Sequence, residues 1–304
     1  MQSVARLGSL VFETSSLSAM HDFYRDVLGL HTLTRTARQA ILADRCGREV
    51  LILREGDRAA CSTVTFALAN RDDMRTVARQ LKDLGLGVEA ASDVTDAMRE
   101  CMSFVDAKGT EVLLFVDRPA QMLAQDVTGI APLKLGHVAF ASADVRRIVD
   151  LYVNGLGFRE SDWVEDIFAF LRCGPDHHTV NFLHGAQTRM HHVAYELKDW
   201  AHVQQACDLL GKRKVPIIWG PGRHRVGHNV FIYHRDPDDH VIELYTELDQ
   251  MKSEALGYFE PRPWHEYAPQ TPRVWTRDEG LPLWGPAPSA DFRRGGQAHL
   301  APEA

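Results

Sequence analysis

The spacing of apolar residues up to residue 116 predicts strands that alternate with amphipathic helices. Leu7–Phe12 is a short apolar run typical of a buried strand, and the apolar residues of 16–27 then recur at helical spacing until Gly29 ends the helix. A second unit of the same kind begins near residue 62. The predicted strands of this region are 7–12, 40–42, 50–53, 62–68 and 111–116, and the predicted helices are 16–27 and 72–84.

The same order of elements returns after residue 130. Each half is expected to contain two units in which a strand leads to a helix and then to further short strands. We therefore predict an α+β fold of four βαβββ units, which form two similar domains with cupped mixed sheets at residues 1–130 and 131–249. The expected helices of the second half are 144–154 and 199–210, and its expected strands include 167–172, 178–183, 190–196, 215–218, 229–234 and 240–246.

A direct repeat supports this division. Leu7–Phe12 returns as Leu135–Phe140, 128 positions later, and Asp106–Phe115 returns as Asp236–Tyr245, 130 positions later. Three matched strand positions differ in their chemistry. The first half carries Ser9, Thr63 and Leu113 where the second half carries His137, His192 and Glu243. Two histidines and a carboxylate can bind a metal, so we predict a first half without metal and a second half that binds it.

Residues 250–304 break the repeat and form a third region, rich in proline and tryptophan. Trp264, Trp275 and Trp284 are spread along it, and large aromatic side chains favour burial. We expect residues 250–285 to lie across a domain as an extended arm, and about the last 15 residues to be disordered.

Charge and length narrow the class of function. The chain of 304 residues has a net formal charge of −7, which disfavours nucleic acid as a partner. No apolar run approaches the roughly 18 residues that span a bilayer, and the first residues lack a secretory pattern, so we expect a cytoplasmic protein with no membrane partner. The five scattered cysteines have no spacing that suits zinc and are expected to be buried thiols.

Strand geometry allows His137, His192 and Glu243 to act together. Side chains alternate across a strand, so strands that line one cupped sheet can aim all three inward. Two histidines and one carboxylate on one side of a metal leave three positions open, as in non-heme Fe(II) oxygenases. A lone histidine is more often a core or surface residue than a ligand, but three such residues at equivalent strand positions favour the metal interpretation.

Three motifs carry a resemblance to a known family. They are Met190-His191-His192-Val193-Ala194-Tyr195, Gly220-Pro221-Gly222-Arg223-His224, and the segment from Asp236 to Tyr245. By these motifs the chain resembles, over nearly all of residues 5–275, the type I extradiol ring-cleaving dioxygenases of the vicinal oxygen chelate superfamily. The resemblance implies the fold of that superfamily and Fe(II) bound by His137, His192 and Glu243, with Mn(II) suited to the same ligands. It selects His192 rather than His191, whose side chain is expected on the opposite face.

The same resemblance implies roles for residues around the metal. It makes His178 the distal acid/base, and it places His224 and Tyr233 where they can hydrogen-bond a catecholate oxygen, as catalytic and substrate-binding residues. Ala139 and Trp219 stand where some members carry a polar and a basic residue. Trp219 is therefore expected to bind an apolar or ring-like part of the substrate rather than a carboxylate. No catalytic role is expected for His184, His228, His234 and His240.

The leading interpretation is an Fe(II) enzyme that cleaves the ring of a small aromatic diol beside its hydroxyl groups and inserts both atoms of O2, as in the catabolism of aromatic compounds. Two other functions stay open on the same fold. A glyoxalase-like isomerase or lyase usually recruits four protein ligands, often from two repeats, and the first half does not supply them. A non-catalytic ligand-binding protein would have no need for further reactive residues around a complete triad. The family also implies a homo-oligomer, and the catechol that is cleaved is left open.

Overall fold

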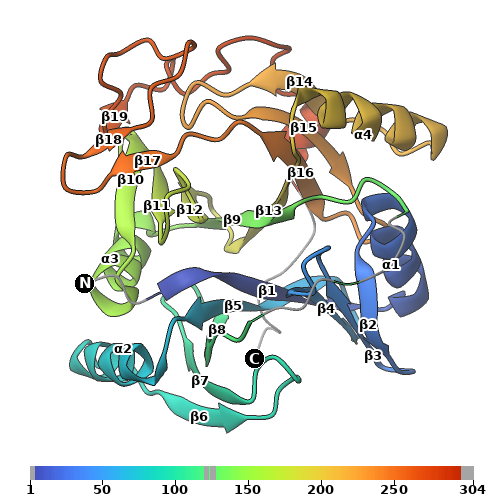
Figure 1. Ribbon diagram of the computed structural model, residues 1–304, viewed down its shortest axis with the longest axis vertical. Helices are drawn as coiled ribbons and strands as arrows, with labels where there is room; N and C mark the ends of the chain where they lie inside the picture. Colours follow the sequence, from blue (N-terminus) through green and yellow to red (C-terminus); the bar gives the residue numbers. More distant parts are fainter. Residues whose placement is uncertain (1–3, 120–122, 124–127, 296–304) are drawn as a thin grey trace.

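A computed structural model describes residues 4–119, 123 and 128–295 of the chain. Four βαβββ units follow one another along the chain and form two mixed sheets that face each other (Figure 1). This arrangement confirms the predicted α+β fold.

The first half supplies one sheet of eight strands in the order β2-β3-β4-β1-β5-β8-β7-β6. Antiparallel pairing of β1 with β5 joins its two units at the centre. The elements are β1 (Val4–Thr14), α1 (Leu17–Phe23), the π-helical turn η1 (Tyr24–Leu28), β2 (His31–Arg35), β3 (Gln39–Ala43), β4 (Glu49–Glu55), β5 (Ala60–Leu68), α2 (Arg71–Asp83), β6 (Glu89–Ser92), β7 (Glu100–Val105) and β8 (Glu111–Val116).

The second half repeats this order, with β9 and β13 paired at the centre of a nine-stranded sheet, β14-β15-β16-β13-β9-β12-β11-β10-β19. The strand expected at 215–218 is instead β14, which begins at Trp219. The elements are β9 (Lys134–Ser142), α3 (Val145–Leu156), β10 (Arg159–Val164), β11 (Phe168–Arg172), β12 (Val180–His184), β13 (Arg189–Glu196), α4 (Trp200–Lys212), β14 (Trp219–Arg223), β15 (Val230–Arg235) and β16 (Val241–Thr246).

The arm after β16 packs on the second half. Its strand β19 (Arg273–Trp275) pairs in parallel with the edge strand β10, and Trp275 is buried there. Two short strands, β17 (Met251–Ser253) and β18 (Tyr258–Phe259), pair with each other. Residues 290–294, which were expected to be disordered, form the short helix α5 (Ala290–Arg294), and residues 296–304 lie outside the described part of the chain.

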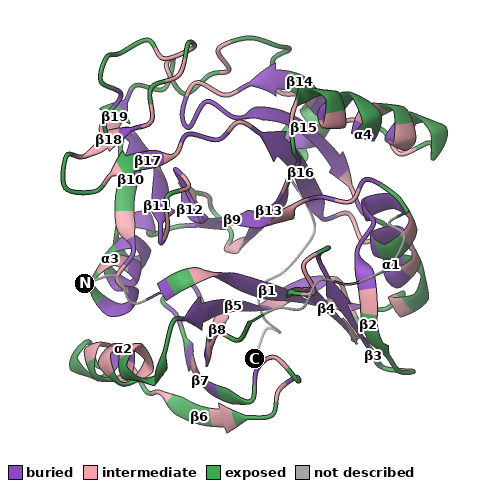
Figure 2. Ribbon diagram, viewed as in Figure 1, coloured by how far each residue is buried: buried purple, intermediate pink, exposed green. Residues whose placement is uncertain are grey.

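One hydrophobic core extends through both halves, and strands β1 and β9 are in contact across it. Figure 2 shows buried residues on the central strands and exposed residues on the outer sides of α2 and α4 and in the loops of the arm. The five cysteines are free thiols, of which Cys46 and Cys207 are only half-buried. Within the described residues, no helix combines the length and apolarity needed to cross a bilayer.

The repeat also produces a reciprocal pair of buried hydrogen bonds between the halves. Tyr24 of the first half donates to Oδ2 of Asp236 over 2.9 Å, and Tyr152 of the second half donates to Oδ2 of Asp106 over 3.1 Å. The two tyrosines are equivalent in the repeat, as are the two aspartates. The halves therefore stabilise one another through charged as well as apolar contacts.

Tyr24→Phe is expected to lower the free energy of unfolding by about 1.5–3 kcal/mol, because it removes a buried hydrogen bond to a carboxylate. Urea denaturation followed by circular dichroism would measure the change. Tyr267→Phe is the control, because Tyr267 is exposed and its loss should change the free energy by less than about 0.5 kcal/mol. Equal stability of the two variants would show that the Tyr24 contact does not join the halves.

Candidate active site

Strand pairing in the second sheet brings the three predicted metal ligands together. Ala194 on β13 pairs with His137 on β9 and with Glu243 on β16, so these three residues form one row across three strands. His192 lies two positions before Ala194 on β13 and therefore shares its face.

The three ligand atoms form a nearly equilateral triangle. Nε2 of His137 and Nε2 of His192 lie 3.1 and 3.2 Å from Oε2 of Glu243, and the two nitrogens are 3.3 Å apart. Ligand atoms about 2.1 Å from a metal and at right angles to one another are separated by about 3.0 Å. The triangle therefore fits one face of an octahedron, and the three buried residues suit a divalent metal with open positions on its other side.

Two neighbouring residues hold the ligands in place. Nδ2 of Asn229 donates to Oε1 of Glu243 over 2.8 Å, and Nδ1 of His191 lies 2.7 Å from Nδ1 of His192. The second contact leaves Nε2 of His192 for the metal. The prediction that His191 points to the opposite face is wrong, because the register of β13 against β9 shifts between Met190 and His192, and both rings line the same cavity.

Electrostatics favour an ionised Glu243. Burial alone would raise the pKa of this carboxyl group, but the imidazoles of His137 and His192 hold it well below its ordinary value. Burial lowers the pKa of His137, which keeps this ring neutral, the form that binds metal. The site thus presents a negative carboxylate beside the neutral ring of His137.

The other predicted residues surround the same cavity, which has a volume of about 250 Å³. The ring of His178 lies 4.3 Å from that of His137, centre to centre. Nε2 of His224 lies 3.1 Å from the hydroxyl of Tyr233, and Trp219 stacks on Tyr233 with ring centres 5.1 Å apart. Burial lowers the pKa of His224 to about 4 and raises the pKa of Tyr233 well above its ordinary value.

Several wall residues were not predicted from the sequence. Phe292 of α5 closes the cavity and packs on Trp219 and Tyr233. Ser289 and Trp219 fix this segment, since Ser289 donates to the carbonyl of Ile218 and the Trp219 indole donates to the carbonyl of Pro286. The remaining apolar wall residues are Val164, Phe168, Phe170, Leu183 and Val226.

The first half has no equivalent site. Leu113, which matches Glu243, belongs to a small apolar cluster with Val11, Ile52 and Phe115. The hydroxyl of Thr65 accepts from the backbone N–H of Ser9 over 2.6 Å. No group of potential ligands able to hold a metal occurs among the described residues of this half.

His234 and His240 lie on the face away from the cavity, as predicted. His240 stacks on Phe12 of the first half, and His234 lies beside Phe23. Neither ring nitrogen of His234 has a hydrogen-bond partner among the described residues. Burial accordingly lowers the pKa of His234 to about 4.

His234 is expected to make the fold sensitive to acid. Its pKa is about 6.5 in the unfolded chain, so the unfolded state gains a proton below that pH while the folded state does not until about pH 4. Stability is therefore lost as the pH falls through this window. Between pH 7.5 and pH 5 the free energy of unfolding should fall by about 2 kcal/mol less in His234→Leu than in the wild type. An unchanged pH slope in His234→Leu would contradict this.

A second group of polar residues lies outside the cavity. Asp249 accepts from Nδ1 of His228 over 2.7 Å and from Nε2 of His265 over 2.8 Å, which ties the arm to the loop before β15. These are hydrogen-bond distances to two different carboxylate oxygens. His228, Asp249 and His265 therefore form a structural bridge, although their ligand atoms also lie close enough together to hold a metal.

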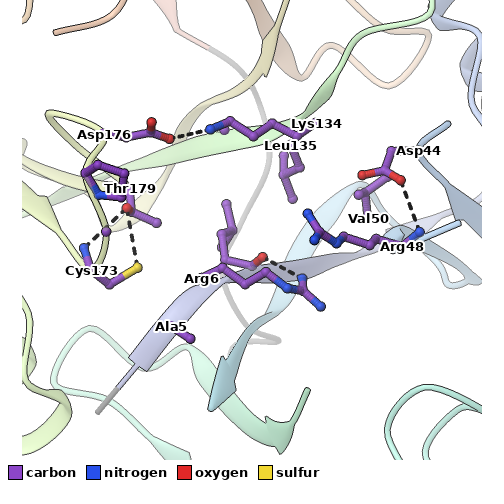
Figure 3. A pocket seen from close by; sticks show the side chains of 15 residues that line it. Ala5, Arg6, Asp44, Arg48, Val50, Lys134, Leu135, Cys173, Asp176 and Thr179 are labelled. Carbon is purple, nitrogen blue, oxygen red and sulfur yellow. Dashed lines mark hydrogen bonds and ion pairs between the residues drawn. The ribbon is translucent and has the colours of Figure 1, made fainter. Parts of the chain in front are cut away.

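Figure 3 shows another cavity, of about 210 Å³, between the two halves. Nζ of Lys134 lies 2.6 Å from Asp176 in its wall, and the backbone N–H of Arg48 donates to Asp44 over 3.1 Å. No histidine lines this cavity. It therefore lacks the ligands that distinguish the cavity above the triad.

Comparison with known proteins identifies the second half. Residues 134–244 match the model of a family described as the Glyoxalase/Bleomycin resistance protein/Dioxygenase superfamily. This segment is a domain of that superfamily. The superfamily domain contains the three triad residues together with His178, His224 and Tyr233.

Two known proteins are similar to this chain beyond the matched segment. The chain is 25% identical over 310 residues to the manganese-dependent 2,3-dihydroxybiphenyl 1,2-dioxygenase of Geobacillus genomosp. 3, which covers 92% of this chain and 96% of that protein. It is 28% identical over 163 residues to metapyrocatechase 2 of Cupriavidus necator, which covers 52% of this chain and 51% of that protein. The chain thus spans about half the length of the second relative. These relatives confirm the resemblance predicted from the motifs.

Solved structures share the fold well beyond the superfamily domain. The Mn(II)-bound glyoxalase from Novosphingobium aromaticivorans has a TM-score of 0.85 at 24% identity, with 99% of this chain and 97% of that chain covered. The complex of homoprotocatechuate 2,3-dioxygenase from Brevibacterium fuscum with 3,4-dihydroxyphenylacetate has a TM-score of 0.82 at 23% identity, with 98% and 94% covered. The four-unit architecture is therefore common to all three proteins.

Proposed function

We propose that this chain is an extradiol dioxygenase, which cleaves the ring of a catechol-type diol beside its hydroxyl groups and adds both atoms of O2 to the product. Fe(II) is the metal we propose for His137, His192 and Glu243, and Mn(II) suits the same ligands. The observation that carries the proposal is the triangle of three ligand atoms beneath a cavity whose wall contains further acid/base groups. The names of both relatives agree with it. A homo-oligomeric state and a cytoplasmic location stay predictions from the sequence.

The residues of the cavity can bind and deprotonate a diol. A bound metal would offer open positions to the two substrate oxygens and to O2, and would lower the pKa of a bound hydroxyl. Tyr233 stays protonated because burial raises its pKa, so its hydroxyl can turn from Nε2 of His224 to donate to a substrate oxygen. His224 is neutral at pH 7 because burial lowers its pKa to about 4, so its Nε2 can accept a proton from a substrate hydroxyl. His178, beside His137, is placed to take a proton from the substrate and to return it to the oxygen that joins the ring.

The cavity wall favours a diol with an uncharged substituent. Aromatic and aliphatic side chains make up most of it, and none of the residues that line it is a lysine or arginine. A carboxylate on the substrate would lose its hydration there without gaining a cationic partner.

Oxygen uptake tests this proposal against its rivals. The protein is loaded with Fe(II) or Mn(II) without oxygen and then given air and a set of catechols with alkyl, aryl or carboxylate substituents. We expect O2 consumption and a yellow ring-cleavage product, fastest with the uncharged diols. Tight catechol binding without O2 uptake, with either metal, would favour a ligand-binding protein. No O2 uptake, together with isomerisation of a glutathione hemithioacetal, would favour a glyoxalase-like enzyme. Either result would refute the dioxygenase assignment.

A further inference from the structure

A line of buried hydrogen bonds connects the arm to His178. Asp162 on β10 accepts from the backbone N–H of Arg273 over 2.7 Å and from Nε1 of Trp275 over 2.9 Å, both on β19. Oδ2 of Asp162 also lies 2.9 Å from Nε2 of His177, and Nδ1 of His177 lies 2.9 Å from Nδ1 of His178. Asp162, His177 and His178 are each no more than 3% exposed, so protein atoms complete these contacts.

The donors around Asp162 limit the directions that the bonds in this line can take. Arg273 and Trp275 can only donate, one to each carboxylate oxygen, so both oxygens of Asp162 act as acceptors. His177 must then donate from Nε2. In the neutral form of His177, which has a single N–H, Nδ1 carries no hydrogen and accepts.

The direction of these bonds determines the tautomer of His178. Because Nδ1 of His177 accepts, Nδ1 of His178 must carry the hydrogen and donate. The other nitrogen, Nε2, is then left with a free lone pair. His178 lines the cavity, so this lone pair is available to a molecule bound above the triad.

We propose that Asp162 and His177 are positioning residues that hold His178 as the Nδ1–H tautomer and so present its Nε2 to the substrate as a proton acceptor. The role of this tautomer in catalysis rests on the proposed dioxygenase function, whereas the tautomer itself does not. The arm takes part through β19, whose two donors keep Asp162 an acceptor. Strand β19 of the arm thereby sets the tautomer of His178, which lies beside the metal site.

Nitrogen NMR of the full-length chain labelled with 15N-histidine tests the tautomer directly, with the protein metal-free and loaded with diamagnetic Zn(II). We expect His178 in the wild type to carry its hydrogen on Nδ1 in both forms. Asp162→Ala should shift His178 toward a mixture of tautomers. Asp236→Ala is the matched control, because it also removes a buried carboxylate that accepts from a histidine ring, and it should leave His178 unchanged. A hydrogen on Nε2 of wild-type His178, or equal shifts in both variants, would overturn the proposal.

Two variants of His177 with nearly the same shape separate positioning from packing. His177→Asn keeps an oxygen able to accept from Nδ1 of His178, whereas His177→Leu does not. We expect the leucine variant to lose the tautomer and to lower kcat at least about tenfold with KM nearly unchanged, and the asparagine variant to retain both. Equal effects of the two substitutions would contradict the positioning role. A wild-type protein with the expected tautomer but no oxygen uptake would refute the dioxygenase function and leave the tautomer proposal standing.

Discussion

His192→Ala is expected to abolish stable metal binding and with it all turnover. The substitution removes one corner of the ligand triangle and leaves only two protein ligands on the ion. Loss of an outer contact to a ligand typically weakens metal binding by about 10–100-fold, so loss of a ligand should cost more than about 100-fold. Metal content after gel filtration and oxygen uptake with catechol would measure both effects.

His191→Ala provides the control for this experiment. His191 is adjacent in the chain and touches the same cavity, but it contacts His192 rather than the metal position. Its loss should weaken metal binding by only about 10–100-fold, and excess metal should restore occupancy. Full metal occupancy in His192→Ala would contradict the ligand assignment.

His178→Ala is expected to show the opposite combination, with metal retained and turnover lost. The ring of His178 lies beside His137 but outside the ligand triangle, so the ion keeps its three protein ligands. A group that transfers a proton during the reaction contributes about 10²–10⁴-fold to the rate, and kcat should fall by that factor. Stopped-flow measurement of product formation, together with metal analysis, would separate the two properties.

The exposed His184 at the end of β12 gives the comparison, and His184→Ala should keep both the metal and the rate. If His178→Ala loses its metal as completely as His192→Ala does, His178 acts as a ligand or a structural residue and not as an acid/base.

The sequence predicted the architecture because the same order of strands and helices occurs in both halves of the chain. Helices α2 and α4 and strand β8 have clear apolar faces, and they were predicted within about two residues. Strands β2, β6, β7 and β10 were not predicted individually, and β2 and β6 show one reason. Both lie at the edge of their sheet with mostly exposed side chains, so no apolar alternation marks them.

The sequence also predicted the metal ligands of the site, but not all of the residues around them. His137, His192 and Glu243 were found because the repeat shows serine, threonine and leucine at the matching positions, and the structure brings them together. His191 was misplaced because a bulge breaks the strict alternation on which the prediction depended. Phe292 left no local signal, since it follows a proline-rich segment and becomes part of the wall only through the path of the arm.

X-ray diffraction from crystals of the Fe(II)- or Mn(II)-loaded protein, measured on both sides of the absorption edge of the metal, tests the metal site most directly. The account predicts one strong anomalous peak about 2.0–2.3 Å from Nε2 of His137, Nε2 of His192 and a carboxylate oxygen of Glu243. A peak at the group formed by His228, Asp249 and His265, with none between the three predicted ligands, would contradict it.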